Sequence, residues 1–481
     1  MHDERHMPTV ALSMIVKNGA ETLRQSLESV RGVVHQIVIA DTGSTDNTCA
    51  IAREFGADII SVPWENDFAK ARNAALGPLK TDWVFVLDAD EELDADAKHK
   101  IPSLMQAADI GGYITPIRNY VNIRFSRGWD RTSVPNDGCH PRAKHAPAYF
   151  VHENCRFFRR DPKIYFTGRV HELVENQVTA LGYKLTFASF FIHHFGQLAE
   201  DQKRDEKAVF YRDLLRLRVQ DLPNDPLGWV QLGLQEYEVF KNPEEGLRCF
   251  GKALTLNSRI NEAWLFTAMI YVDLGKNQEA LTALECDRRE GPVTALREQL
   301  KGDALLGLNR FMEARQAYRR AMKLSRVDDP LLESKIGYTE VKAGQKSTGL
   351  AKLRRAARSA PGVFAIHDRL MKACIMADRL PEAAEVAENL AKASANPKFF
   401  LRAASIHAQT QQWQKAANIL AHGISLFPQS PELRAALTEV ARSPHGNSQQ
   451  TAQPPQVTSE SQADVGVARG AAATSREESC R

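Results

Sequence analysis

The sequence has no long hydrophobic run, few cysteines and almost no net charge, and each absence excludes a class of protein. No uninterrupted apolar stretch approaches the ~18 residues of a membrane span, so no transmembrane segment is expected. The formal net charge is only +3, which by itself implies no nucleic-acid or membrane-surface partner. The seven cysteines are odd in number and scattered, which is typical of reduced thiols. The first eight residues are polar and charged, so we expect no cleaved signal peptide and a cytoplasmic location.

The composition is that of an ordinary globular protein with several parts. Of the 481 residues, 43% are hydrophobic and 25% are charged, which excludes a wholly disordered chain. The last part is rich in Gln, Ser, Ala and Pro and has no aromatic residue, so it cannot bury enough apolar surface to become ordered. We expect an α/β domain over residues 1–205, a linker helix over 206–224, a helical repeat domain over 225–440 and a disordered tail over 441–481.

A repeat of nearly constant length runs through the helical part. In five of six copies a small residue is followed four positions later by a larger one, and the small residues are 34, 34, 35, 34 and 33 positions apart: Gly246, Ala280, Ala314, Gly349, Ala383 and Ala416. This period resembles about six tetratricopeptide repeats, in which small residues permit close helix crossing. The alternative is an unrelated helical bundle. Repeats of this kind bind peptides or partner proteins and carry no chemistry of their own.

Strand-like and helix-like segments alternate in the amino-terminal part. Apolar runs predict strands over residues 9–16, 36–40, 59–62 and 82–87, and a helix over 67–75. The alternation favours a doubly wound, mostly parallel α/β sheet. In such sheets the ligand lies beyond the carboxyl ends of the strands.

Acidic residues follow two of the predicted strands. Asp41 ends the second strand, and Asp88 and Asp90 follow the fourth. Two carboxylates at i and i+2 after a strand can converge on one hard divalent cation, which would neutralise a diphosphate leaving group. The alternative is an acidic turn that caps a helix starting near Glu91. Asp46, in the turn-rich stretch after Asp41, is predicted to be a helix N-cap.

Four motifs occur in order within the first 93 residues: SMIVKNGAETLRQSLESV, IVIADTGSTDNT, DFAKARNAAL and DWVFVLDADEEL. Together they resemble the amino-terminal half of a family 2 glycosyltransferase with the GT-A (Rossmann-like) fold, which binds a nucleotide-sugar. The chain is similar to bacterial members that carry tetratricopeptide repeats after the catalytic domain, including peptide S-glycosyltransferase-like enzymes. The resemblance covers residues 9–200 through these motifs and the repeat region through its architecture.

The resemblance implies which residues bind the nucleotide-sugar. Asp41 would hydrogen-bond the base or ribose, and Lys17 and Asn18 would border the nucleotide pocket. Many relatives have two acids before the glycine of the second motif, whereas this chain has only Asp41 there. Arg72 would approach the base or the diphosphate, and Asp88 would contact the ribose.

The resemblance also implies a divalent cation, Mn²⁺ or Mg²⁺. Asp88 and Asp90 would be its ligands. GT-A folds often recruit a late histidine as a further ligand, and His194, in the stretch FFIHHFG, fits that place best. A histidine that is merely packed or hydrogen-bonded is the alternative.

An inverting transferase needs one carboxylate to deprotonate the acceptor nucleophile. Residues 168–172 (GRVHE) resemble the glycine and His-Glu segment of the relatives, so Glu172 is the expected base and Glu153 the second choice. The alternative for Glu172 is an ordinary surface carboxylate paired with Arg169.

Residues 116–170 hold eleven Lys and Arg against four Asp and Glu. We interpret this stretch as a loop on the acceptor side, with a plain solvated loop as the alternative. It also contains Cys139, His140, His145, His152 and Cys155, the residue types of a zinc site, although their spacing matches no familiar pattern.

The leading hypothesis is an inverting, metal-dependent glycosyltransferase that uses a nucleoside-diphosphate sugar, first of all a UDP-sugar. Its acceptor would be a protein, a peptide or a surface glycan, and the repeats would position that acceptor or a partner protein. The main rival is a repeat scaffold whose GT-A-like domain is inactive. A sugar-phosphate nucleotidyltransferase is set aside, because the first strand is followed by KNGAETL instead of a glycine-rich, Arg-containing loop.

Overall fold

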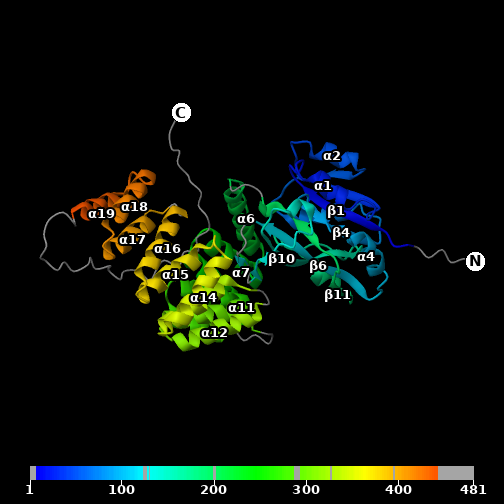
Figure 1. Cartoon of the computed structure of the whole chain (residues 1–481). Helices are drawn as coiled ribbons and strands as arrows, with labels where there is room; N and C mark the ends of the chain where they lie inside the picture. The colour runs from blue at the N-terminus through cyan, green and yellow to red at the C-terminus, as the bar shows by residue number, and fades with distance from the viewer. Residues whose placement is uncertain are drawn as a thin grey trace, which may run out of the picture. The chain divides into compact units, whose positions relative to one another are not determined.

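The computed structural model describes residues 7–122, 127–128, 131–198, 202–286, 293–325, 328–393 and 396–442. The chain divides into two compact units, Met1–Ser258 and Arg259–Arg481 (Figure 1). The α/β part, the expected linker helix and the first expected repeat all belong to the first unit. The tail predicted to be disordered lies, from residue 443 onward, outside the described residues.

One mixed sheet forms the core of the first unit, and β1, β4, β6, β10 and β11 are labelled in Figure 1. Its strands follow the order β3-β2-β1-β4-β10-β6-β12-β5, with β11 paired to β6 and β9 paired to β10. The strand bounds are β1 Val10–Val16, β2 Gln36–Asp41, β3 Asp58–Ser61, β4 Trp83–Val86, β5 Glu91–Leu93, β6 Ile110–Val121, β9 Val134–Pro135, β10 Ala148–Arg159, β11 Lys184–Phe187 and β12 Ile192–His194. A separate ribbon joins β7 (Arg127–Gly128) to β8 (Arg131–Thr132).

The strand directions change in the middle of the sheet. β3, β2, β1 and β4 are parallel, as the alternation of strands and helices predicts. β10 runs antiparallel to both β4 and β6, whereas β11 and β12 pair parallel with β6 and β12 pairs antiparallel with β5, so the second half of the sheet is mixed. In the described part of the connection from β6 to β10, the helical element is the three-residue turn Pro141–Ala143, which is too short for a crossover, and the chain returns alongside β6 in the opposite direction.

Helices cover both faces of the sheet, which confirms the doubly wound arrangement. α1, α2 and α4 pack on the face that carries Leu12 and Phe85, and α3 and α5 pack on the face that carries Ala11 and Val84. Successive strand residues point to opposite faces, so each strand supplies both cores. The helix bounds are α1 Leu23–Ser29, α2 Thr48–Glu54, α3 Phe68–Leu76, α4 Ala97–Leu104 and α5 Glu175–Ala180, with short 3₁₀ turns η1 Pro141–Ala143 and η2 Gly196–Leu198.

Two aspartates act at helix starts, and one of them differs from expectation. Asp67 caps α3 with a side-chain hydrogen bond. The sequence predicts Asp46 as the N-cap of the next helix after β2, but this is wrong, because α2 has Asn47 as its N-cap. Asp46 accepts instead from the backbone amides of Thr48 at 3.0 Å and Ala20 at 3.1 Å. Its carboxylate therefore ties the start of α2 to the loop after β1.

The first unit ends in helices that share its apolar core. They are α6 Gln202–Asp221, α7 Pro226–Leu234, the π-helical turn η3 Gln235–Val239 and α8 Pro243–Leu256. α6 contains the stretch expected to be a linker, yet its Leu214 and Leu215 are buried in one cluster with Val170 and Leu232. α6 is thus packed between the α/β part and the first helix pair.

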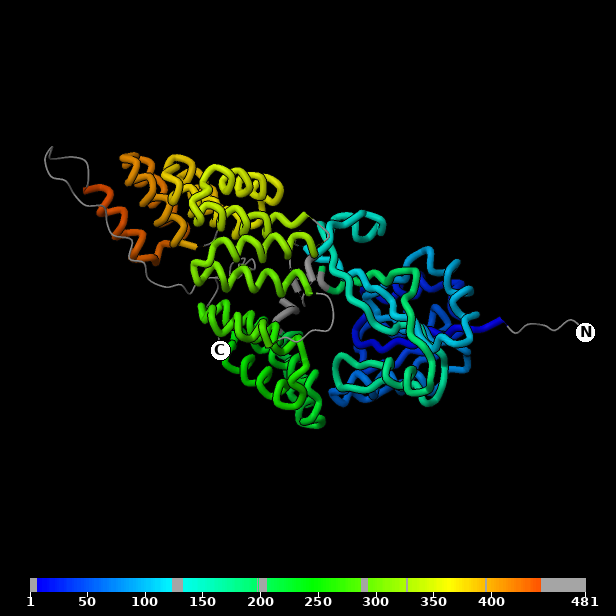
Figure 2. The backbone as a smooth tube through the Cα atoms, turned by 90° about the horizontal axis from the view of Figure 1, so that it is seen from below, coloured from blue at the N-terminus to red at the C-terminus, as the bar shows by residue number. Residues whose placement is uncertain are grey.

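The second unit is a series of helix pairs. Figure 2 shows them following one another from green through yellow to orange. The helices are α9 Asn261–Asp273, α10 Asn277–Cys286, α11 Ala295–Gly307, α12 Phe311–Leu324, α13 Pro330–Lys342, α14 Lys346–Ser359, α15 Phe364–Met376, α16 Leu380–Ala393, α17 Pro397–Gln409, α18 Trp413–Leu426 and α19 Pro431–Arg442. This architecture confirms the prediction of a repeat domain.

The small repeat residues are buried where the sequence predicts close helix crossing. All six lie in the second helix of a pair, from Gly246 in α8 to Ala416 in α18. A methyl group on Gly337 of α13 would stand 2.7 Å from the backbone oxygen of Gly349 in α14. Because no side chain fits at that distance, the two backbones touch directly.

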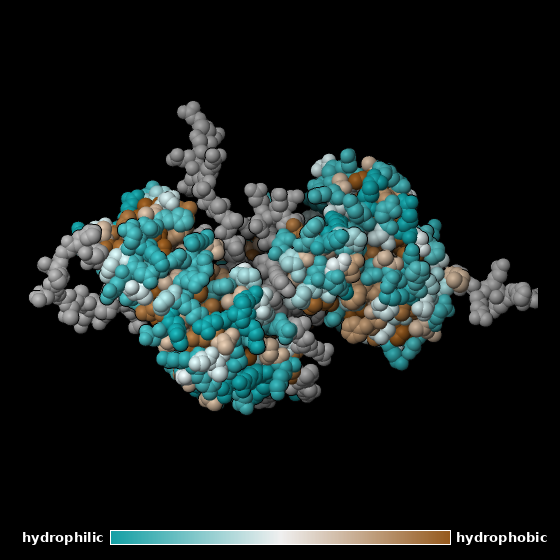
Figure 3. Space-filling view, viewed as in Figure 1, coloured by the Kyte–Doolittle hydropathy of each residue, from teal (hydrophilic) through white to brown (hydrophobic). Residues whose placement is uncertain are grey.

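No helix in the described ranges is long and apolar enough to cross a membrane. The face of the molecule in Figure 3 is mainly hydrophilic, with apolar residues distributed among polar ones. α6 has twenty residues, and charged residues recur between Glu206 and Asp221.

Candidate active site

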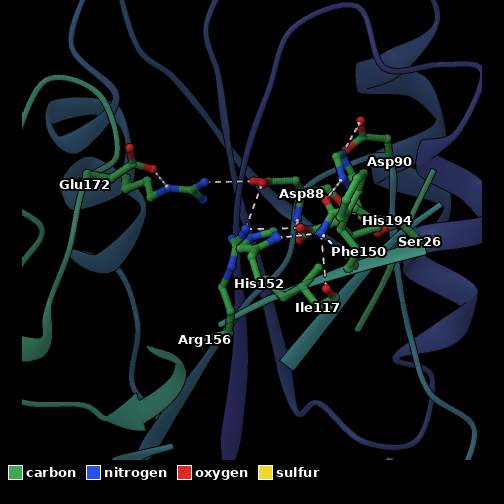
Figure 4. Close-up of polar contacts among 12 residues, drawn as sticks. Ser26, Asp88, Asp90, Ile117, Phe150, His152, Arg156, Glu172 and His194 are labelled. Carbon is green, nitrogen blue, oxygen red and sulfur yellow. Dashed lines mark hydrogen bonds and ion pairs between the residues drawn. The ribbon is translucent and has the colours of Figure 1, made fainter. Parts of the chain in front are cut away.

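The acidic residues predicted at strand ends lie along one edge of the parallel half of the sheet. Asp41 is the last residue of β2, and Asp88 and Asp90 follow β4. β1 lies between these two strands and is parallel to both, so all three end on the same edge. In Figure 4, Asp88 stands at the centre, with Glu172 on one side and Asp90 with His194 on the other.

Arg72 of α3 joins Asp88 to Glu172. Its Nη2 donates to Asp88 Oδ1 at 2.9 Å, and its Nε donates to Glu172 Oε1 at 2.5 Å. The Arg72 side chain is only 8% exposed and that of Glu172 only 10%. Burial opposes the charge of Arg72, but the two carboxylates outweigh it and raise the pKa of the guanidinium. The Nη1 of Arg72 is buried and has no hydrogen-bond partner among the described residues.

A second arginine, Arg156 of β10, also holds Asp88. Its Nη2 lies 3.2 Å from Asp88 Oδ2 and 3.1 Å from Glu91 Oε1, and Glu91 accepts in turn from the backbone amide of Asp88 at 2.9 Å. Burial raises the pKa of Asp88, but Arg72 and Arg156 together lower it well below its usual range. Asp88 is therefore an ionised carboxylate with a guanidinium on each oxygen.

Asp90 faces a histidine rather than an arginine. His194 Nε2 lies 3.2 Å from Asp90 Oδ2. On the other side of the ring, His194 Nδ1 donates to Asn119 Oδ1 at 2.6 Å, which fixes the ring so that Nε2 points to Asp90. Asn119 is itself held by His152 Nδ1 at 2.5 Å. Burial raises the pKa of Asp90, but the hydrogen bond from His194 outweighs it and the net shift is downward.

The pair Asp90 and His194 fits a divalent cation. A carboxylate oxygen and an imidazole nitrogen are both suitable ligands for Mn²⁺. A methyl group on Gly196 would stand 2.4 Å from Asp90 Oδ2 and 2.7 Å from His194 Nε2. Glycine at this position therefore keeps open the space onto which both ligand atoms point. Among the described residues, no group of three or more His, Cys, Asp or Glu side chains forms a complete metal site, so further ligands would come from the substrate or water.

The sequence predicts that Asp88 shares that cation with Asp90. In the structure Asp88 differs from Asp90, because its carboxylate is bound by arginines. Both of its oxygens carry an arginine, and each guanidinium competes with a cation for them. The expectation that Asp88 is a metal ligand stays a prediction. A role in orienting Arg72 and Arg156 is what its contacts provide.

The residues expected around the nucleotide lie at the ends of β1 and β2. Asp41 is 8% exposed and accepts from the backbone amide of Ser44 at 3.1 Å. Asn18 has a positive φ of 52° and accepts from the backbone amide of Thr45 at 2.8 Å, so it joins the loop after β1 to the loop after β2. Lys17, beside it, is exposed. These loops have the position expected of a nucleotide pocket, whereas direct nucleotide contacts stay predictions.

The two candidates for the base differ in their surroundings. Glu172 pairs with Arg72, while Arg169 pairs with Asp221, so the alternative of a surface Glu172–Arg169 pair is wrong. Glu153 is an exposed residue in the middle of β10. Glu172 is thus the candidate that Arg72 joins to Asp88, and its role as the base stays a prediction.

The basic stretch 116–170 is a loop only in part, because two long strands run through it. β6 takes up residues 116–121 and β10 residues 148–159, and these two strands pair, whereas residues 136–147 and 160–166 have no regular structure apart from η1; residues 123–126 and 129–130 lie outside the described part. The zinc residue types in this stretch do not gather. Cys139 contacts Arg118 at 2.8 Å, Cys155 is buried in the apolar core, and His152 bonds Asn119.

Arg156 and Asn119 are site residues that sequence reasoning missed. Each sits in a long strand of the second half of the sheet, where the sequence was interpreted mainly as a basic loop. Arg156 could have been recognised from the sequence, because it stands alone between Cys155 and Phe157, which are both core residues. A charged side chain in an apolar strand needs a buried partner.

The acidic pair after the fourth strand of a doubly wound sheet, with Glu172 joined to it through Arg72, agrees with what the resemblance to GT-A glycosyltransferases implies. Residues 12–164 match the family model "Glycosyl transferase family 2", and residues 263–340 match "Tetratricopeptide repeat-like domain". The chain therefore contains a family 2 glycosyltransferase domain followed by tetratricopeptide-like repeats. This confirms the resemblance drawn from the four motifs.

The chain is similar both to a repeat-containing protein and to a glycosyltransferase. It is 31% identical over 233 residues to a TPR repeat-containing protein of Synechococcus elongatus, covering 47% of this chain and 52% of that protein. It is 21% identical over 263 residues to the SPbeta prophage-derived glycosyltransferase SunS of Bacillus subtilis, covering 54% of this chain and 57% of that protein. The chain thus spans about half the length of these curated relatives. A tetratricopeptide repeat protein from Parabacteroides merdae aligns with a TM-score of 0.39 and 16% identity, covering 50% of this chain and 95% of that chain.

Proposed function

We propose that this chain is an inverting, metal-dependent glycosyltransferase that moves a sugar from a nucleoside-diphosphate sugar, with a UDP-sugar as the first candidate, to a protein, peptide or surface-glycan acceptor. The observation that carries the proposal is the row of charged groups from Glu172 through Arg72 to Asp88, with Asp90 and His194 beside it. A domain that had lost its chemistry would not need to keep these buried charges together.

The row offers a place for each part of the reaction. The loops that hold Asn18 and Asp41 would take the nucleoside, and Asp90 with His194 would hold Mn²⁺ or Mg²⁺. A bound divalent cation would offset the negative charge that builds up on the leaving diphosphate. Glu172, held by Arg72, would take the proton of the acceptor nucleophile while that nucleophile attacks the anomeric carbon from the opposite side.

The repeats support a macromolecular acceptor or partner. Helix pairs of this kind form extended binding surfaces and add no catalytic group. We propose that they position a protein or peptide acceptor, or a partner protein, for the transferase domain. The cytoplasmic location expected from the sequence stays a prediction.

A binding experiment tests the donor site without knowledge of the acceptor. Calorimetric and thermal-shift titrations of UDP, GDP and CDP would be run with Mn²⁺ and with EDTA. Metal-dependent binding of one nucleotide is expected, and Asp90→Asn should abolish the metal dependence. Asp96→Asn is the matched control, because it removes an acid whose side chain is 74% exposed and forms an exposed ion pair with Lys100, four positions later. Absence of binding by all three nucleotides would favour the alternative, a repeat scaffold with an inactive domain.

A further inference from the structure

α6 presents one continuous side to the transferase domain. Lys207, Tyr211, Leu214, Leu215 and Arg218 follow at the spacing of a single helix face. Leu214 and Leu215 are buried in the cluster that contains Val170. This helix lies beyond the residues matched by the family 2 model, which end at 164.

The lower part of this face fixes the loop that carries Glu172. Arg218 Nη1 donates to the backbone oxygen of Val170 at 2.8 Å, and Asp221 pairs with Arg169. From the opposite side, the backbone amide of Phe68 donates to the backbone oxygen of Arg169 at 2.8 Å. The loop is therefore held between α3 and α6, and α6 cannot shift without moving the proposed base.

The upper part of the face brings Tyr211 to the site. Its ring stacks on Phe68, at 6.1 Å between centroids and 23° between planes, and lies 6.4 Å from the ring of His171, the residue before Glu172. Tyr211 thus stands between the start of the helix that carries Arg72 and the loop that carries Glu172.

The Tyr211 hydroxyl has no hydrogen-bond partner within the described ranges. Burial, together with the charges of Asp88, Glu172 and Asp90, raises the pKa of Tyr211 to about 12, so the group stays a neutral O–H donor. One turn earlier on the helix, Lys207 is near enough for its charge to act on Asp90.

We propose that the Tyr211 hydroxyl hydrogen-bonds the sugar that is transferred, so that α6 forms one wall of the sugar subsite. The inference rests on the proposed function. In that reaction the sugar lies between the diphosphate, near Asp90, and the base, Glu172, and Tyr211 is the neutral donor that stands near both. A neutral hydroxyl among three carboxylates suits a sugar hydroxyl, which both donates and accepts, better than a diphosphate.

The test compares a nucleotide with its sugar ester in the variant Tyr211→Phe, which removes only the hydroxyl and keeps the ring. UDP and then UDP-glucose, UDP-galactose and UDP-N-acetylglucosamine would be titrated with Mn²⁺ into the full chain. For the sugar ester that binds best, we expect Tyr211→Phe to weaken binding about 3- to 10-fold, the worth of one hydrogen bond. UDP should bind unchanged.

Two controls separate this role from a structural one. Val209→Ala changes a side chain on α6 that is 42% exposed, and both affinities should stay as in the native chain. Leu215→Ala removes buried packing of α6, and it should lower the unfolding temperature without a selective loss for the sugar ester.

The outcomes are distinct. If UDP binds equally well and UDP-sugar affinity in Tyr211→Phe equals that of the native chain, the inference about Tyr211 is wrong while the proposed donor site stands. An equal loss of UDP and UDP-sugar affinity would also refute the sugar contact. If the native chain binds no nucleotide and no ester, the proposed function fails, and the inference fails with it.

Discussion

Replacing Arg72 by glutamine tests whether the centre of the site is a dry ion-pair network. The variant leaves Glu172 buried without its guanidinium, whereas Asp88 keeps Arg156 as a partner. The Arg72 and Glu172 side chains are 8% and 10% exposed, so this pair belongs to the class in which loss of one partner costs about 3–5 kcal/mol. For a unit of this size, that corresponds to a fall in unfolding temperature of roughly 6–20 °C.

Differential scanning calorimetry and urea unfolding would measure the effect on the first unit. Lys70→Gln is the matched control, because Lys70 is two positions earlier on the same helix and its pair with Glu65 is exposed, so no change is expected. The double variant Arg72→Gln/Glu172→Gln removes the orphaned charge and should be more stable than Arg72→Gln alone. If it is not, or if Arg72→Gln unfolds like the native chain, the network is solvated and the reasoning about a dry site is wrong.

Three further predictions concern the metal site, the repeats and the extent of the transferase unit. Gly196→Ala would push apart the Asp90 carboxylate and the His194 imidazole. Mn²⁺-dependent nucleotide binding should therefore fall at least about 10-fold, with little change in unfolding temperature. Unchanged metal dependence would contradict the assigned ligands. Arg354→Gln should destabilise the repeats by under about 1 kcal/mol at neutral pH. Because the hydrogen bond from Arg354 lowers the pKa of Glu382, this difference should be complete above the ordinary glutamate pKa and shrink as the pH falls below it, as followed by urea unfolding at each pH. A chain that ends at residue 258 should unfold cooperatively in calorimetry, and one that ends at residue 205 should not, because it lacks the α6 side chains buried against the transferase domain.

The edge of the sheet where the site lies could be predicted because its signals are local. An apolar run followed by acids marks a strand end, and this placed Asp41, Asp88 and Asp90 correctly along the carboxyl edge. The repeat period likewise placed every small residue at a helix crossing. Both patterns depend only on spacing within a short window.

The contacts within the site could not be predicted from spacing, because their residues are distant in the sequence, and only the resemblance implied that Asp90 and His194 share a ligand. Arg72 and Glu172 are 100 positions apart, and Asp90 and His194 are 104 apart. No periodicity relates such pairs, which meet only because β10 and β12 join the sheet beside β4 and β6. Tyr211 was missed for a similar reason. Its helix is charged and of low mean hydropathy, so it resembled a solvated linker although one face packs against the domain.

The single guanidinium shared by Glu172 and Asp88 has a consequence for the order in which products leave. In the proposed transfer, Glu172 gains a proton when the sugar is transferred to the acceptor. The neutral Glu172 then no longer offsets the positive charge of Arg72. The uncompensated charge is turned toward the Asp88 side, where the departing nucleotide has just become more negative. The enzyme would therefore hold the nucleotide most tightly immediately after transfer, and would loosen it only when Glu172 returns its proton to water. This arrangement of charges therefore favours an ordered release, in which the glycosylated acceptor dissociates before the nucleotide.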